Sequence, residues 1–261
     1  MYNKKLNDEW IARLQRVVAG KRVLLVGNAA TLFTEPHGKL IDSYDIVVRF
    51  GKGVPYSAFG DFLGSRTDVW FFGTARSGMY ESYPKSCFKV YTPAQMYLYQ
   101  DKKQLLVPEY MFNGQFQVYR DFMLSGDSDY IKELQLKVNR GDNSKRLSQG
   151  VQGVDFFISQ VKTQKAVDLI GFDFFEGEVR YTYDNESDVI PREHISSSWH
   201  CPLVSKDYKS NPHSDGENKN EEDYIRASGV TIHPMPKHVN YKRMQKVFDM
   251  LRGGKVKLER N

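Results

Sequence analysis

The hydrophobic and polar positions of the first fifty residues divide into one amphipathic segment and two apolar runs. Residues 8–19 place apolar side chains at helical spacing, which predicts a packing helix. Residues 22–26 are rich in Val and Leu without alternation, as is typical of a parallel strand buried on both faces. A second apolar run, residues 44–50, predicts the next strand. The chain is therefore expected to open as helix, buried strand, turn and strand.

The same two patterns continue along the chain. Further apolar runs predict strands at residues 69–72, 88–91, 105–107, 166–171 and 230–233. Helical spacing or composition predicts helices at residues 110–123, 130–138, 148–161, 221–229 and 240–251. Because strands and helices alternate at both ends of the chain, we expect an α/β fold: an open, mostly parallel, Rossmann-like sheet with helices on both faces.

One long segment departs from this alternation. Residues 181–220 are polar, contain three prolines and are rich in Ser, Asp and Asn. A polar stretch of this length within a compact domain is typical of a functional loop or of disorder. We expect one domain, residues 1–261, with residues 181–220 as a flexible lid.

Composition narrows the class of protein. The chain is 40% hydrophobic and 26% charged, as in ordinary soluble domains, and no run approaches the roughly 20 apolar residues of a membrane span. The N-terminus lacks the apolar core of a signal peptide, so a cytoplasmic location is expected. The net charge of +5 is dispersed except near the C-terminus, which disfavours a nucleic-acid partner but suits anionic substrates or peripheral membrane contact. Cys87 and Cys201 have no metal-ligand neighbours at useful spacing, so no metal is expected.

The turn after the first predicted strand has the residues of a ligand-binding turn. Gly27 permits a sharp turn, Asn28 supplies an amide, and Ala29 is small enough for a ligand to approach. A helix opening near Thr31 would favour an anion there. Neither G-x-G-x-x-G nor a P-loop is present, and many α/β proteins have such a turn without a site. The turn alone leaves a nucleotide site and a structural turn equally open.

Two later segments belong with this turn. Ser148, Gln149 and Gly150 form a second glycine-rich helix start, and residues 172–177 follow the strand at 166–171. Ligands of open α/β sheets bind outside the carboxyl ends of the strands. We therefore expect the three segments to line one cleft.

The order of these motifs resembles that of known sialyltransferases. VGNAATLFTEPHGKLIDSYDIVVRF resembles the long sialylmotif of the family 29 sialyltransferases, and SQGVQGVDFFISQVKTQKAVDLIGFDFF is similar to the short sialylmotif. HSDGENKNEEDYI looks like the very short motif, and the layout also resembles the bacterial family 42 sialyltransferases. The resemblance covers residues 21–73 and 146–235. It implies the GT-A-like variant of the fold found in sialyltransferases.

The resemblance implies a reaction. A sialyltransferase moves sialic acid or a related nonulosonic acid from a CMP-sugar to a glycan or glycolipid acceptor, with inversion and without metal or cofactor. The oxocarbenium-like centre resembles that of glycoside hydrolysis. The sugar carboxylate withdraws electrons and CMP is a good leaving group, so the enzyme needs a base for the acceptor hydroxyl and donors for the departing phosphate.

The motifs carry these roles onto particular residues. His213 is the expected base, because a neutral imidazole accepts a proton near pH 7, and Glu217 is its acidic partner one residue closer than usual. Glu217 alternatively supplies only the negative charge of a helix N-terminus. Tyr181 is the expected phosphate contact, with Tyr183 or His200 as substitutes because a second family 42 tyrosine falls on Phe175. Alternatively, Tyr181 and Tyr183 have only a structural role and pack an edge strand.

The expected CMP site is assembled from both ends of the chain. A second asparagine of the long motif is replaced by Gly51. The nucleotide-binding residues are expected to be Gly27, Asn28, Ala29, Ser148, Gln149, Gly150, Phe172 and Asp173.

Several other functions compete with this one. A transferase of another CMP-activated keto sugar such as Kdo, and a hydrolase of the CMP-sugar, would both use the same site. A non-catalytic nucleotide-binding module is favoured if the departures at Gly51 and Phe175 mark a decayed site. A nucleic-acid-binding protein would use the basic C-terminal helix.

Overall fold

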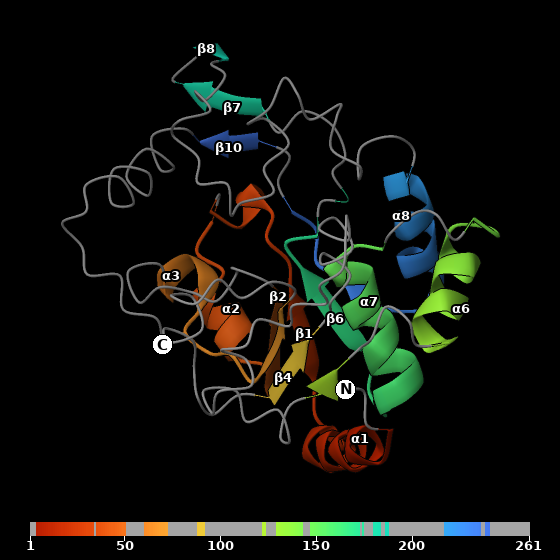
Figure 1. Ribbon diagram of the computed structural model, residues 1–261. Helices are drawn as coiled ribbons and strands as arrows, with labels where there is room; N and C mark the ends of the chain where they lie inside the picture. Colours follow the sequence, from red (N-terminus) through yellow and green to blue (C-terminus); the bar gives the residue numbers. More distant parts are fainter. Residues whose placement is uncertain are drawn as a thin grey trace, which may run out of the picture.

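A computed structural model gives the architecture of the chain (Figure 1). It describes residues 4–33, 35–50, 60–72, 88–91, 122–123, 129–142, 147–172, 174, 180–183, 186–187, 217–235 and 238–240.

Strands of the described residues form two sheets. The larger sheet has the order β5-β4-β3-β2-β1-β6-β9, and every neighbouring pair in it is parallel. The expected open parallel sheet is therefore confirmed. Its strands are β1 (Val23–Val26), β2 (Ile46–Phe50), β3 (Val69–Phe72), β4 (Phe88–Tyr91), β5 (Phe122–Met123), β6 (Val167–Ile170) and β9 (Thr231–Ile232).

The first strand lies in the middle of the larger sheet. In β1, Val23 pairs with Ile46 of β2 on one side and with Val167 of β6 on the other. All four residues of β1 are buried, as the unbroken apolar run predicts for a strand covered on both faces. The turn that follows β1 is thereby held at the centre of the sheet.

Helices cover both faces of this sheet (Figure 1). On one face, α1, α6, α7 and α8 bury a core against side chains of β1, β2, β3 and β6. The opposite face is covered by η1, α2 and α3. The helical elements are α1 (Lys4–Val18), η1 (Ala30–Phe33), α2 (Gly38–Asp42), α3 (Gly60–Leu63), α6 (Asp129–Val138), α7 (Gln149–Asp155), η4 (Phe156–Val161, a π-helix) and α8 (Glu217–Ala227).

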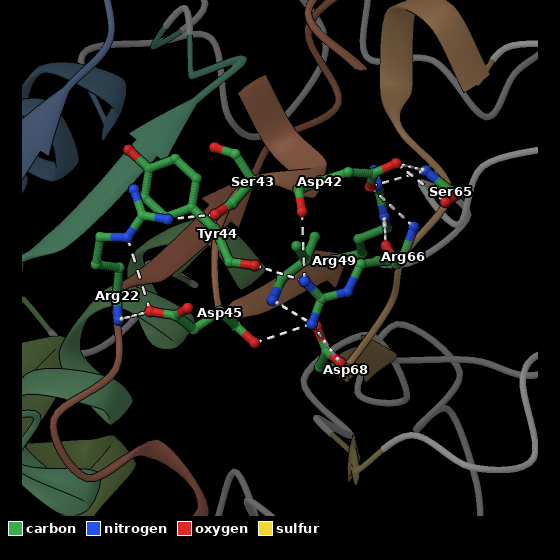
Figure 2. A network of polar contacts seen from close by, with 10 residues as sticks. Arg22, Asp42, Ser43, Tyr44, Asp45, Arg49, Ser65, Arg66 and Asp68 are labelled. Carbon is green, nitrogen blue, oxygen red and sulfur yellow. Dashed lines mark hydrogen bonds and ion pairs between the residues drawn. The ribbon is translucent and has the colours of Figure 1, made fainter. Parts of the chain in front are cut away.

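A polar network joins β2 to the loop between α3 and β3 (Figure 2). The guanidinium of Arg66 donates to the backbone carbonyls of Asp42, Tyr44 and Asp45 and to the carboxylate of Asp68. Asp42 in turn accepts the backbone N–H groups of Ser65 and Arg66. We call Asp42, Tyr44, Asp45, Arg49, Ser65, Arg66 and Asp68 the Arg66 network.

Arg49 is the buried member of the Arg66 network. Its side chain is 0% exposed, and it donates to the backbone carbonyls of Arg66 (2.8 Å) and Leu63 (2.5 Å). Burial lowers the pKa of Arg49 to about 9, although Asp42 and Asp68 act in the opposite direction. Arg49 therefore remains a cation at neutral pH, and its bonds tie β2 to α3.

The chain does not open an α-helix near Thr31. The turn after β1 leads into a single 3₁₀ turn, η1, and the next helix starts only at Gly38. Pro36 explains the interruption, because a proline disfavours the helical conformation of the residue before it. The dipole that an α-helix would place beside Asn28 is therefore absent from this turn.

One sequence-based assignment is wrong at its end, the helix expected at residues 110–123. Phe122 and Met123 form β5, which pairs with Val90 and Tyr91 of β4, so tertiary pairing overrides the local pattern. Asn240, expected to open the last helix, is likewise the last residue of strand β10. Residues 110–121 and 241–251 lie outside the described residues, as do the strand expected at residues 105–107 and the loop at residues 51–59.

The start of the expected lid forms strands rather than an irregular loop. β7 (Arg180–Tyr183) pairs in parallel with β10 (His238–Asn240) and antiparallel with β8 (Glu186–Ser187). β10 also lies against η1, so this small sheet lies beside the turn that follows β1 (Figure 1). Residues 188–216 of the expected lid lie outside the described residues.

Candidate functional site

The order of the strands marks one point of the larger sheet. From β1 the chain adds β2, β3, β4 and β5 on one side, and then returns to add β6 and β9 on the other. Between β1 and β3, the elements η1, α2 and α3 cover one face, whereas α8, between β6 and β9, covers the other. The carboxyl ends of β1 and β6 therefore form a topological switch point, where open α/β sheets bind their ligands.

Gly27 brings the ends of these two strands into close contact. Its N–H donates to the carbonyl of Ile170 at 2.8 Å, and the N–H of Ala29 donates to the carbonyl of Gly171 at 3.2 Å. A Cβ on Gly27 would lie 2.1 Å from the carbonyl oxygen of Gly171. The sequence predicts a glycine here for a sharp turn, but Gly27 has no positive φ. The contact with Gly171 is the reason that only glycine fits.

Asn28 joins the ends of β1 and β2. Its Nδ2 donates to the backbone carbonyl of Phe50 at 3.1 Å, and the residue is partly exposed. Because a carbonyl only accepts, the amide nitrogen must face Phe50 and the amide oxygen must face away from it. Asn28 is thus oriented to present an acceptor oxygen at the switch point.

The second predicted segment meets the first through Phe172. Ser148 is the N-cap of α7, and its Oγ accepts the N–H of Val151 at 3.3 Å. A Cβ on Gly150 would lie 2.9 Å from Cε1 of Phe172, and a Cβ on Gly27 would lie 3.0 Å from Cδ2 of the same ring. The Phe172 ring therefore lies between the turn after β1 and the first turn of α7.

Aromatic rings fill the space beneath these segments. The ring of Phe172 meets Phe50 edge to face with centroids 6.0 Å apart, and Phe50 packs against Gly153, where a Cβ would lie 2.5 Å from its Cε1. Phe174 continues the series at 6.5 Å from Phe172, and the guanidinium of Arg226 in α8 lies 5.1 Å above its ring. The switch point thus has an apolar floor with polar groups at its edge.

The structure brings together most of the residues predicted to bind a nucleotide. Gly27, Asn28 and Ala29 follow β1, Phe172 follows β6, and Ser148, Gln149 and Gly150 form the start of α7. We call these seven residues the switch-point cluster. Asp173, the eighth predicted member, lies outside the described residues.

The predicted catalytic residues are placed only in part. Tyr181 and Tyr183 belong to β7, the middle strand of the small sheet, rather than to an edge strand. Glu217 is the first residue of α8, as its alternative role as a helix N-terminal charge requires. His213 and His200 lie outside the described residues, together with Gly51 and Phe175.

The sequence did not single out Glu221. This carboxylate is 7% exposed, and its Oε1 accepts the backbone N–H of Ser148 at 2.6 Å, across from α8 to the start of α7. A glutamate within a charged helical segment, NKNEEDYIR, carries no signal that separates a buried member from its exposed neighbours. Its role emerges only from the packing of α8 on α7.

A separate polar cluster lies away from the switch point, at the start of β2. The hydroxyl of Tyr44 donates to Asp168 at 2.6 Å and lies 2.8 Å from Nε2 of His233. Burial raises the pKa of Tyr44, and the neighbouring Asp168 raises it further, so the hydroxyl stays protonated. Tyr44 is therefore a neutral hydrogen-bond donor at physiological pH rather than a catalytic charge. The pKa of His37 is lowered, mainly by burial. Nearby Glu35 acts to raise this pKa, and His233 acts to lower it.

Neither a metal centre nor a membrane span is found in the described part of the chain. Within these residues, no group of three or more His, Cys, Asp or Glu side chains is placed to hold a metal ion. Among the described helices, none combines the length and apolar character needed to cross a bilayer.

Comparison with known families gives this geometry a context. Residues 19–188, more than half of the chain, match the model of glycosyltransferase family 29 (sialyltransferase). The chain belongs to glycosyltransferase family 29. The matched range includes the whole switch-point cluster, so the residues that meet at the end of β1 are part of the family 29 domain.

Solved structures similar to this family 29 chain include a mammalian sialyltransferase. Its crystal structure matches with 17% sequence identity over 90% of this chain and 81% of that chain, with a TM-score of 0.47. The structure of a mammalian sialyltransferase in complex with Gal-beta-1-3GalNAc-ortho-nitrophenol also matches with 17% identity, over 90% of this chain and 88% of that chain, with a TM-score of 0.43. No curated protein sequence matches this chain at a significant level.

Proposed function

We propose that this family 29 glycosyltransferase moves sialic acid or a related nonulosonic acid from a CMP-sugar to a glycan or glycolipid acceptor, with inversion. The observation that carries the proposal is the meeting of three sequence-distant segments at the switch point, inside the range that matches the family. A nucleotide held there would lie outside the carboxyl ends of β1 and β6.

The switch-point cluster supplies groups suited to a nucleoside monophosphate. The amide oxygen of Asn28 faces away from Phe50 and can accept a hydroxyl or amino hydrogen. In the described contacts the Ser148 hydroxyl acts as an acceptor toward Val151, so its own proton can still be donated. The apolar floor of Phe172 and Phe50 suits the flat surface of a base or ribose.

The chemical step needs a base and a stabilised leaving group. His213 removes the proton of the acceptor hydroxyl, the hydroxyl oxygen bonds to the anomeric carbon from the opposite side, and the bond to the phosphate oxygen breaks to release CMP. Glu217 would assist His213, and Tyr181, with Tyr183 or His200, would donate to the departing phosphate. Asp173 completes the nucleotide site. The proposed step uses no metal and no cofactor.

A nucleotide screen tests the donor class. A ligand that binds only the folded state stabilises it, by about 2.7 kcal/mol at one hundred times its dissociation constant. We expect CMP and CDP to raise the melting temperature, and UDP, GDP and NAD to leave it unchanged. Stabilisation by UDP alone would remove the CMP-sugar proposal.

A second experiment tests catalysis apart from binding. His213→Ala should lower turnover by about 10²- to 10⁴-fold while CMP still binds, because general-base catalysis contributes that much. Release of CMP from CMP-sialic acid is measured with and without a glycan acceptor. If CMP is released equally fast without acceptor, the protein is a hydrolase of the CMP-sugar. If CMP-Kdo is used in preference to CMP-sialic acid, the alternative donor is correct. If CMP binds but no CMP is released from either sugar, the protein is a non-catalytic nucleotide-binding module.

A further inference from the structure

Two polar contacts hold α8 along α7. Near one end of α7, Glu221 accepts the backbone N–H of Ser148 at 2.6 Å. At the other end, the hydroxyl of Tyr224 donates to the carboxylate of Asp155, which is 5% exposed and also accepts from Tyr130 at 2.5 Å. Glu221 and Tyr224 are three residues apart, so they lie on the same side of α8, which packs against α7 (Figure 1).

The contact of Glu221 completes a capping box between two helices. In the usual capping box, the side chain of the N-cap residue accepts from the third helical residue, and a Glu or Gln at that third position accepts the N-cap N–H in return. Ser148 makes the first bond, to Val151. Val151 is the third residue of α7 and is 0% exposed, so this position is used by the core and cannot return the bond. Glu221 of α8 supplies the missing carboxylate.

The position of this bond links it to the nucleotide site. It holds the residue immediately before Gln149 and Gly150, and Gly150 contacts the ring of Phe172 so closely that a Cβ would lie 2.9 Å from it. A hydrogen bond to a buried carboxylate is shorter and about twice as strong as one between neutral groups. Displacement of the first turn of α7 would therefore shift both the Ser148 hydroxyl and the Gly150 to Phe172 contact.

We infer that Glu221 is a positioning residue, which reaches across from α8 to hold the Ser148–Gly150 turn in the geometry that receives the nucleotide. The inference rests on the proposed function of the switch-point cluster. It also gives a role to Glu221, which lies in the segment that resembles the very short motif but has no role assigned there. α8 follows the segment of His213 in sequence, so one helix connects the proposed base segment to the proposed nucleotide turn.

Three variants test this role. Glu221→Ala removes the acceptor, and Glu221→Gln keeps an oxygen that can accept the Ser148 N–H. Glu222→Ala is the matched control, because Glu222 is 5% exposed, lies one position further along α8 and pairs with Lys219 and Arg226 of the same helix. Calorimetry measures the dissociation constant of CMP, and amide hydrogen exchange measures protection at residues 148–150.

We expect Glu221→Ala to raise the dissociation constant of CMP at least tenfold and to speed exchange of the Ser148 amide at least tenfold. Glu221→Gln should stay within threefold of the wild type in both measurements, as should Glu222→Ala. Stability in urea is measured for every variant without ligand, so that general loss of folding is separated from loss of positioning.

The outcomes separate this inference from the proposed function. If the wild type binds CMP and Glu221→Ala binds it equally well, the positioning role is wrong and the proposed function stands. If Glu221→Ala and Glu222→Ala weaken binding equally, the effect is general to α8 and the positioning role is again wrong. A wild type that binds no nucleotide overturns both proposals.

Discussion

The switch-point cluster and the Arg66 network show opposite uses of polar groups in one sheet. In the Arg66 network, the guanidinium of Arg66 reaches three backbone carbonyls and Asp68, and Asp42 accepts from two backbone N–H groups. At the switch point, the described side-chain bonds of Asn28 and Ser148 leave an amide oxygen and a hydroxyl proton for a ligand.

The difference shows which features mark a binding site. A dense set of charged residues whose hydrogen bonds are made to neighbouring loops holds those loops together, and its density says little about ligands. A site is better marked by glycines required for close contact between strand ends, such as Gly27, together with partly exposed polar side chains whose bonding capacity is only partly used. Substitutions at Arg49, Gly27, Asn28 and His37 test this contrast.

Arg49→Met should destabilise the fold most. The change leaves the carbonyls of Leu63 and Arg66 without their buried donor and removes the buried cation that interacts with Asp42 and Asp68. Removal of one partner from a buried charged group costs about 3–5 kcal/mol of the free energy of unfolding, measured in urea. Lys39→Met, an exposed change in α2, is the control. If Arg49→Met folds normally but loses its response to CMP, the Arg66 network belongs to the site.

Gly27→Ala should damage both folding and binding. The added Cβ would lie 2.1 Å from the carbonyl oxygen of Gly171, and neither backbone segment can move without separating β1 from β6. We expect a loss of about 3 kcal/mol in the free energy of unfolding, and CMP affinity at least tenfold weaker. Gly60→Ala is the control, since open space surrounds that position and its φ is negative. If Gly27→Ala and Gly60→Ala change the free energy of unfolding and the CMP affinity equally, the close contact at Gly27 is contradicted.

Asn28→Ala should separate binding from stability. The Phe50 carbonyl loses one partly buried hydrogen bond, which is worth about 1 kcal/mol. Gln15→Ala is a matched control, because the side-chain amide of Gln15 donates to the carbonyl of Gln160 at 3.0 Å in a partly buried setting far from the switch point. Both variants should lose similar stability, but only Asn28→Ala should weaken CMP binding, by tenfold or more. If calorimetry gives both variants the same dissociation constant for CMP, Asn28 is not part of the nucleotide site.

The pH dependence of stability should be the smallest effect. Burial lowers the pKa of His37 below its ordinary value of 6.5, so the unfolded chain binds the proton more readily than the folded one. Stability should therefore fall as pH decreases below about 6.5, through the lowered pKa of the folded state. His37→Gln should flatten the curve of unfolding free energy against pH in that window, measured in urea between pH 7 and pH 5. An unchanged slope would show that another group titrates there.

Much of this contrast can be predicted from the sequence, because it follows from local patterns. The unbroken apolar run of β1 predicts a central strand, and the Ser148 to Gly150 segment predicts a glycine-rich helix start. A shared sheet edge predicts that these segments meet, and the structure shows them in contact through Gly27, Gly150 and Phe172. These features depend on residues close together in the chain or on one shared sheet edge.

The remaining features depend on contacts between distant residues, which local patterns do not carry. Glu221 acts through a bond to Ser148 made only when α8 packs on α7. Phe122 and Met123 are drawn into the sheet by β4. The reason for Gly27 also differed from the expected one, since a carbonyl from another strand, rather than a turn, excludes a side chain there.

The central place of β1 has a consequence for the order in which the protein is made. β1 is translated early and pairs at once with β2, but its other edge waits for β6, which comes late in the chain. Such pairing raises the contact order and slows folding. Until β6 arrives, a nascent chain carries an apolar strand with one unpaired edge, which is a hazard for aggregation. The switch point also needs β6, so a truncated chain cannot form the site.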